Sequence, residues 1–239
     1  MTTQAKPTLQ LLRSEDRGHA NHGWLNARHS FSFANYYNPE QMGFRSLRVI
    51  NQDRIAGGGG FPTHPHRDME IFTYVLSGEL KHKDSMGNEG SIRPGQIQLM
   101  SAGSGVTHSE SNGSSEEEAS LLQIWITPER QGLTPSYTDW APSAQQRSSN
   151  MALLISPDGR EQSATIHQDA YIYRLELAAG ETVTHELKEG RGAWIQLIKG
   201  KLQVNNAELS TGDAVFTEEN GSISLTAIEH TEALFFDLK

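Results

Sequence analysis

The chain has 239 residues, which is enough for one large domain or two small ones. It carries 20 lysines and arginines against 29 aspartates and glutamates, so its formal charge is −9 and we expect no direct binding of nucleic acid. A mean hydropathy of −0.55, with apolar runs far shorter than the roughly 20 residues of a membrane-spanning helix, argues against a membrane partner.

The chain contains no cysteine, which excludes disulfides, thiolate nucleophiles and cysteine-ligated metal centres. Its 10 histidines make imidazole, together with carboxylate, the group that would hold any metal. Residues 1–7 contain no apolar segment of the secretion-signal type, and we expect a cytoplasmic protein.

Glycine and proline recur along the chain between short runs of β-branched and aromatic residues, a pattern typical of strands joined by turns. In chain order, the clearest predicted strands are 71–76, 97–100, 122–126, 194–198, 223–225 and 234–236. Several of them alternate apolar and polar residues, and no long stripe of helical period accompanies them. The chain is therefore predicted to be all-β, as a sandwich or a barrel.

Two parts of the chain repeat one arrangement of strand, glycine turn and returning strand. The hairpin around Gly78 is similar to the hairpin around Gly200, and the turn at Gly95 is similar to the turn at Gly212. Because both landmarks recur in the same order and at nearly the same offset, we predict two jelly-roll-like β-barrels related by duplication. Unrelated glycine-turn hairpins, which are common in β proteins, are the alternative.

A change in composition separates the two predicted barrels. Residues 127–150 contain three prolines and a polar tail, and few of them suit the core of a strand. We therefore predict a first barrel over residues 1–126, a linker over residues 127–150 and a second barrel over residues 151–239.

The candidate chemistry lies in the first barrel, in two pairs of residues with i, i+2 spacing. His64 and His66 precede the predicted strand 71–76, and His108 and Glu110 follow later in the same barrel. Alternate side chains of a strand share one face, so each pair can point into the barrel. Three imidazoles and one carboxylate would form a divalent-metal site with open positions, with an incidental cluster as the alternative.

Longer motifs around these residues resemble known families. The two cupin motifs are similar in spacing to Gly58, His64, His66, Glu70 and Gly78, followed by Gly105, His108 and Asn112. The runs that resemble the pirin family are 17–25, 29–34, 44–49, 63–70, 84–88 and 100–105. They cover nearly the whole first barrel and look closest to bacterial pirin-like proteins with quercetin 2,3-dioxygenase activity. This resemblance implies a bicupin fold with one metal in the N-terminal barrel, held by His64, His66, His108 and Glu110.

The choice of carboxylate ligand depends on the resemblance. In the general cupin pattern the carboxylate lies in the first motif, at the position of Glu70, whereas pirins take it from the second motif, where this chain has Glu110. Strand parity alone does not exclude Glu70. We choose Glu110 as the metal ligand. We expect Glu70 either to contact one of the ligand residues without binding the metal itself, or to pair with Arg67 or Arg48.

The second barrel lacks the corresponding donor residues. His185 is the histidine near the first motif position, and its i+2 partner is Leu187. The places of the second ligand pair are occupied by Leu225 and Ala227. We expect no metal in this barrel, which either has a structural role or closes the pocket of the first barrel.

Other histidines and aromatic residues receive simpler interpretations. His82 lies between Lys81 and Lys83 and is predicted to face solvent. His19, His22 and His29 are expected to hydrogen-bond loops near the first barrel, with a role in a pocket as the alternative. The aromatic residues that either wall a pocket for a flat ligand or belong to the core are Trp24, Phe31, Phe33 and Phe44.

The resemblance implies cleavage of a flavonol such as quercetin by dioxygen, with release of carbon monoxide. Fe(II) suits the ligand set best, and Mn, Ni, Co, Cu or Zn also fit it. Glu110 is in addition the candidate base for the substrate hydroxyl. A non-enzymatic, iron-dependent regulator acting through protein partners and a cupin enzyme acting on another small molecule are the alternatives. A wide apolar slot beside the metal favours the flavonol, and a small polar one favours a small acid.

Overall fold

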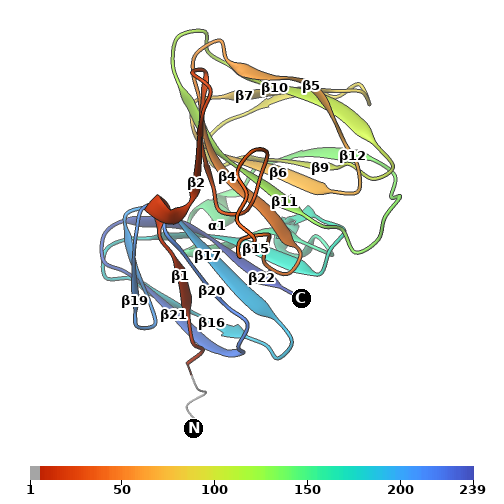
Figure 1. The fold of residues 1–239 in the computed structure, drawn as a ribbon. Helices are drawn as coiled ribbons and strands as arrows, with labels where there is room; N and C mark the ends of the chain where they lie inside the picture. Colours follow the sequence, from red (N-terminus) through yellow and green to blue (C-terminus); the bar gives the residue numbers. More distant parts are fainter. Residues whose placement is uncertain (1–5) are drawn as a thin grey trace. The chain divides into compact units, whose positions relative to one another are not determined.

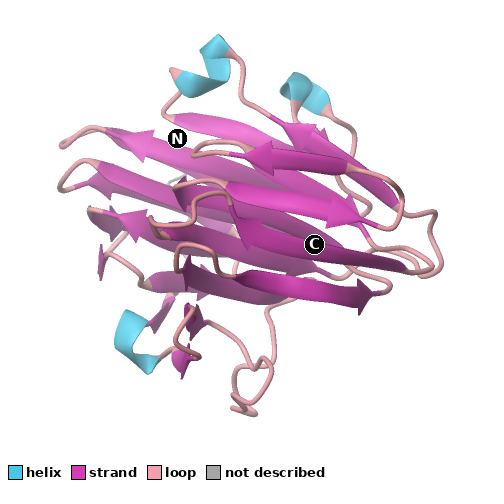
Figure 2. Ribbon diagram, turned by 90° about the horizontal axis from the view of Figure 1, so that it is seen from above, coloured by secondary structure: helices cyan, strands magenta, loops and turns pink. Residues whose placement is uncertain are grey.

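The computed structural model describes residues 6–239, so most of the segment 1–7 used above lies outside the described residues. The described chain consists mainly of strands, with one short helix, α1 (Ala144–Arg147), and two 3-10 turns, η1 (Ser14–Asp16) and η2 (Arg160–Gln162). Figure 2 shows this predominance of strand, and the prediction of an all-β chain is confirmed. Among residues 6–239, no helix is long and apolar enough to cross a membrane.

The described chain divides into two compact units. The N-terminal unit comprises residues 17–142 and 166–168, and the C-terminal unit comprises residues 6–16, 143–165 and 169–239. Each unit contains one seven-stranded sheet and one four-stranded sheet.

The N-terminal unit contains the strands that carry the candidate ligands (Figure 1). In spatial order its larger sheet consists of β12 (Ser136–Trp140), β9 (Ile97–Ser101), β6 (Glu70–Ser77), β11 (Ala119–Ile126), β4 (Leu47–Ile55), β3 (Leu25–His29) and β2 (Gly18–Asn21). Its smaller sheet consists of β5 (Gly60–His66), β10 (Val106–Asn112), β7 (Leu80–Asp84) and β8 (Glu89–Ile92). A buried cluster joins Ile55 and Leu121 of the larger sheet to Leu80 and Ile92 of the smaller one, so the two sheets share a core.

The C-terminal unit is built in the same way. In spatial order its larger sheet consists of β1 (Gln10–Leu12), β20 (Ala214–Thr217), β17 (Gly192–Lys199), β22 (Thr231–Leu238), β15 (Ala170–Leu177), β13 (Met151–Ser156) and β14 (Ala164–Thr165). Its smaller sheet consists of β16 (Thr182–Leu187), β21 (Gly221–Ala227), β18 (Lys201–Val204) and β19 (Ala207–Ser210). Leu225 and Ala227, at the places of the second ligand pair, lie in its apolar core together with Leu187.

The strand orders of the two units correspond. The order β9-β6-β11-β4 in one unit matches β20-β17-β22-β15 in the other, and β5-β10-β7-β8 matches β16-β21-β18-β19. The predicted pair of duplicated barrels is therefore confirmed.

The unit boundaries differ from the predicted ones at two strands. Strand β12 falls within the predicted linker 127–150 but pairs with β9 of the N-terminal unit. Strand β1 falls within residues 1–126 but pairs with β20 of the C-terminal unit. Both strands lie at sheet edges, where backbone hydrogen bonds hold a segment that has few buried side chains. Hydrophobic pattern therefore gives little indication of either strand.

Candidate metal centre and its cavity

Strands β5 and β10 carry the two predicted ligand pairs and lie side by side. They pair antiparallel, with His64 opposite His108. Burial alternates along β10, so that His108 and Glu110 face the interior while Thr107 and Ser111 are exposed. The i, i+2 argument from the sequence therefore places this pair on one inward face.

A glycine allows β5 to approach β10 closely at Glu110. The register of the two strands shifts between His108 and Glu110, and Gly60 lies opposite Ser111. A Cβ atom at Gly60 would lie 2.6 Å from the Glu110 carbonyl oxygen, so a larger residue would displace one of the strands.

His64, His66 and His108 converge on one point. Their candidate ligand nitrogens lie within 4.8 Å of one another, and the Nε2 atoms of His64 and His108 are 3.1 Å apart. The Nδ1 of His64 donates to the Pro62 carbonyl oxygen at 2.7 Å, which leaves its Nε2 with the lone pair. Burial, followed by the charge of neighbouring histidine, lowers the pKa of His66 to about 4 and that of His108 to about 3. Both rings are neutral at pH 7, which is the state that a metal requires.

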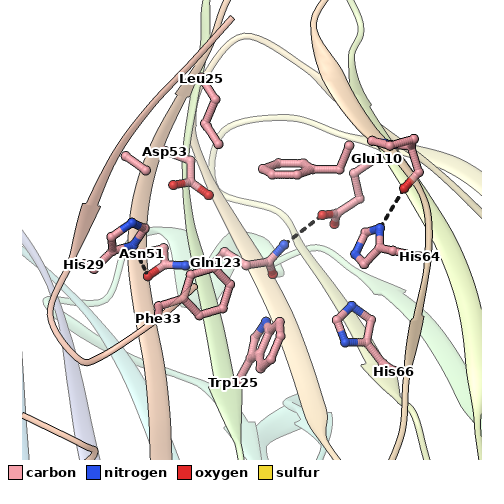
Figure 3. A pocket seen from close by; sticks show the side chains of 13 residues that line it. Leu25, His29, Phe33, Asn51, Asp53, His64, His66, Glu110, Gln123 and Trp125 are labelled. Carbon is pink, nitrogen blue, oxygen red and sulfur yellow. Dashed lines mark hydrogen bonds between the residues drawn. The ribbon is translucent and has the colours of Figure 1, made fainter. Parts of the chain in front are cut away.

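Glu110 is buried beside these histidines. Its carboxylate accepts a hydrogen bond from Gln123 Nε2 at 2.8 Å (Figure 3). One of its oxygens lies within 4.8 Å of candidate ligand atoms of His82 and His108. Burial, followed by the charge of Asp53, raises the pKa of Glu110 to about 7. The structure thus brings the three predicted imidazoles together. It also places the predicted carboxylate next to them, where Gln123 holds it by a hydrogen bond.

The prediction that His82 faces solvent is wrong. The residue is only 2% exposed, because Lys81 and Lys83 take the outward positions of β7 and His82 takes the inward one. Its ring stacks on Tyr137, with 4.5 Å between the ring centroids. The alternation of the strand would have located His82 correctly, whereas the charge of its two neighbours was misleading.

His82 connects a carboxylate to one of the three converging histidines. Its Nε2 lies 3.2 Å from Asp84 Oδ2, and since the carboxylate accepts, Nε2 carries the hydrogen. Burial is the main influence on the pKa of His82 and lowers it, so the ring is neutral and its Nδ1 is an acceptor. This Nδ1 accepts a hydrogen bond from Gln98 Nε2 at 2.8 Å and lies 3.3 Å from Nδ1 of His108. His82 is therefore held between Asp84 and Gln98, and its ring lies against that of His108.

Glu70 is also buried, but its partners are not the expected ones. It accepts a hydrogen bond from the Ser101 hydroxyl at 2.6 Å, and Nδ1 of His167 lies 3.4 Å from the carboxylate. Arg67 pairs with an aspartate and Arg48 donates to backbone carbonyls. The ion-pair alternative for Glu70 is therefore wrong.

A cavity of about 320 Å³ opens beside the histidines (Figure 3). His64, His66 and Glu110 lie on one side of it. The aromatic residues Phe33, Phe61 and Trp125 contribute to its lining. Of the other aromatic residues considered for a pocket, Phe31 and Phe44 are buried in the core, and Trp24 packs edge-on against Phe61. A lining of this kind suits a flat ring rather than a small acid.

The wall facing the histidines carries polar residues that the sequence analysis did not assign. Asn51 and Asp53 lie on β4, and Gln123 lies on β11. They occupy inward positions between apolar neighbours of the same parity, which is the signal that would have identified them. His29 lines the same wall and its Nδ1 bonds Asn51 Oδ1 at 2.7 Å, so the pocket alternative is confirmed for His29. Burial raises the pKa of Asp53 to about 7.

Comparisons with known proteins agree with this architecture. The pirin family profile matches residues 12–126, and a profile described as the quercetinase C-terminal cupin domain matches residues 153–238. A quercetin 2,3-dioxygenase of Escherichia coli K12 is 48% identical over 230 residues, covering 96% of this chain and 98% of the relative. A protein of Pasteurella multocida, named as a putative quercetin 2,3-dioxygenase, is 42% identical and covers 96% of this chain and 99% of its own.

Solved structures show the same fold. The crystal structure of the bacterial pirin YhhW from Escherichia coli in complex with nickel(II) has a TM-score of 0.92 at 46% identity, covering 97% of this chain and 99% of that one. A quercetin 2,3-dioxygenase from Acinetobacter baumannii has a TM-score of 0.80 at 21% identity, covering 100% of this chain and 88% of that one, and shows the fold alone. The duplicated barrels and the full-length similarity lead to one conclusion: the chain belongs to the pirin family.

Proposed function

We propose that this protein is a metal-dependent dioxygenase that cleaves flavonols such as quercetin, consuming dioxygen and giving a depside and carbon monoxide. The observation that carries the proposal is the convergence of three imidazoles on the wall of an aromatic-lined cavity. The names of the relatives, which match over nearly their whole length, support the same reaction.

The donor set fits a divalent transition metal. We propose His64, His66, His108 and Glu110 as its ligands and Fe(II) as the metal, because imidazole and carboxylate with open positions suit dioxygen chemistry. When bound, the metal would act as a Lewis acid toward the flavonol oxygens. The hydrogen bond from Nδ1 of His64 to the Pro62 carbonyl oxygen leaves the Nε2 lone pair of that ring for this purpose.

The residues of the chain would perform two further tasks. Glu110 would take the proton of the substrate hydroxyl, since a carboxylate within hydrogen-bond reach of that group is a suitable base. Phe33, Phe61 and Trp125 would hold the flat ring and exclude water from the cavity.

The test combines metal analysis with turnover on the same samples. Wild type, His66→Ala, Glu110→Ala and the exposed control His230→Ala are loaded with Fe(II) under argon, analysed for metal, and then given quercetin and oxygen. We expect about one metal per chain and quercetin loss for wild type and the control, and loss of both for the two site variants. Wild type that holds its metal but leaves the quercetin spectrum unchanged would refute the proposal.

A further inference from the structure

The carboxyl group of Asp53 has no task in the chemistry described above. The residue lies on β4, on the cavity wall that faces the histidines (Figure 3), and is 3% exposed. Its Oδ1 is buried and has no hydrogen-bond partner within residues 6–239. A buried acceptor without a donor is costly, so the group requires an explanation.

The other buried carboxylates of the protein show what a structural role looks like. Glu70 accepts from Ser101, and Asp237 bonds His185 at 2.8 Å. Asp84 accepts from the backbone nitrogens of two residues in its own turn. Among the described residues 6–239, Asp53 is the only aspartate or glutamate with a buried, unpartnered oxygen. Its position in the cavity therefore distinguishes it from carboxylates that only stabilise the fold.

A second acceptor lies on the same wall. The Nδ1 of His29 lies 2.7 Å from the Asn51 amide oxygen and donates to it, because that oxygen can only accept. Burial, which is the main influence, lowers the pKa of His29, so the ring is neutral and its Nε2 is left as an acceptor. These two acceptors are complemented by a ligand that carries hydrogen-bond donors, while Trp125 Nε1, a buried donor without a partner among residues 6–239, lines the same cavity.

The cavity defines the rest of that ligand. Phe33, Phe61 and Trp125 require a flat, apolar body, and a phenol combines such a body with a hydroxyl donor. We propose that Asp53 is a specificity-determining residue, which accepts a hydrogen bond from a hydroxyl of a polyphenol at the end remote from the three histidines. The inference rests on the proposed function and adds to it a preference for polyhydroxylated flavonols.

The test compares two ligands that share the flavonol core. Quercetin carries hydroxyls on both outer rings, and 3-hydroxyflavone carries only the one at position 3. Both are titrated under argon into protein without added metal, with quenching of tryptophan fluorescence as the signal, so that binding is measured apart from turnover. The variants are Asp53→Leu and Asp158→Leu, an exposed aspartate of the C-terminal unit that serves as the control.

We expect wild type and the control to prefer quercetin, and Asp53→Leu to bind quercetin about tenfold more weakly while its affinity for 3-hydroxyflavone is unchanged. We also expect Asp53→Leu to melt no lower than wild type, because it removes a buried acceptor without a donor. Equal losses for both ligands, unchanged quercetin binding, or a lower melting temperature would each overturn the assignment. If wild type binds quercetin through Asp53 but never consumes it when loaded with Fe(II), the proposed reaction fails and the binding role of Asp53 stands.

Discussion

Replacing His82 by phenylalanine tests how the metal site is oriented. Phenylalanine keeps the ring that stacks on Tyr137 but has no Nδ1, the atom that accepts from Gln98 Nε2 at 2.8 Å and lies 3.3 Å from Nδ1 of His108. The variant therefore removes the buried polar contacts that fix the surroundings of the His108 ring. We expect metal binding to require restoring the orientation of that ring, at a cost of about 1–3 kcal/mol. This free energy corresponds to roughly tenfold to hundredfold weaker metal binding.

The assay is competition between protein and a chelating dye for Ni(II), on wild type, His82→Phe and the exposed control His230→Phe. We expect weaker binding only for His82→Phe, and thermal unfolding shows whether each variant is folded. A folded His82→Phe with wild-type Ni(II) affinity would show that His82 does not orient the site, and the reasoning would be refuted.

Three further predictions concern other parts of the structure. Gly60→Ala places a Cβ atom 2.6 Å from the Glu110 carbonyl oxygen, so we expect a loss of about 1–3 kcal/mol in unfolding free energy by urea titration, together with weaker metal binding. Glu70→Ala leaves the Ser101 hydroxyl without its acceptor, and we expect lower stability but unchanged metal content; metal loss would make Glu70 the carboxylate ligand instead of Glu110. Hydrogen bonds from His185 and Arg191 outweigh burial and hold the pKa of Asp237 below its usual 3.8, so its contribution to stability is present above that pH and is lost as the pH falls through the depressed value. Melting temperatures from pH 7 down to pH 2 should therefore fall less steeply at the acid end for Asp237→Asn than for wild type, and parallel curves would contradict this.

Local patterns predicted the parts of this protein that depend on neighbours in sequence. The period of two in runs such as 223–225 identified strands, because alternate side chains of a strand face opposite sides. The same rule placed His108 and Glu110 together on β10. It would also have placed His82 inside, had the alternation of β7 been preferred to the charge of the flanking lysines.

Local patterns could not predict which sheet an edge strand joins or which residues from other strands a buried side chain contacts. Strands β1 and β12 are held mainly by backbone hydrogen bonds, which every residue except proline can form, so composition does not reveal which sheet they join. One of the two alternatives for Glu70 paired it with Arg67 or Arg48, and instead it meets Ser101 and His167. Such partners depend on strand register and on long connections, which a one-dimensional pattern does not encode.

The sequence by itself determined the all-β duplicated fold and the histidines of the candidate metal centre, because both follow from short motifs and strand parity. Only the tertiary structure decided what surrounds those histidines. The contact between His82 and His108 and the Gln123 bond to Glu110 each join different strands. The carboxyl of Asp53 is left with an unpartnered oxygen by the way β4 is packed. The physical reason is that the protonation and partners of a buried polar group are set by the atoms packed around it, and those atoms come from distant parts of the chain.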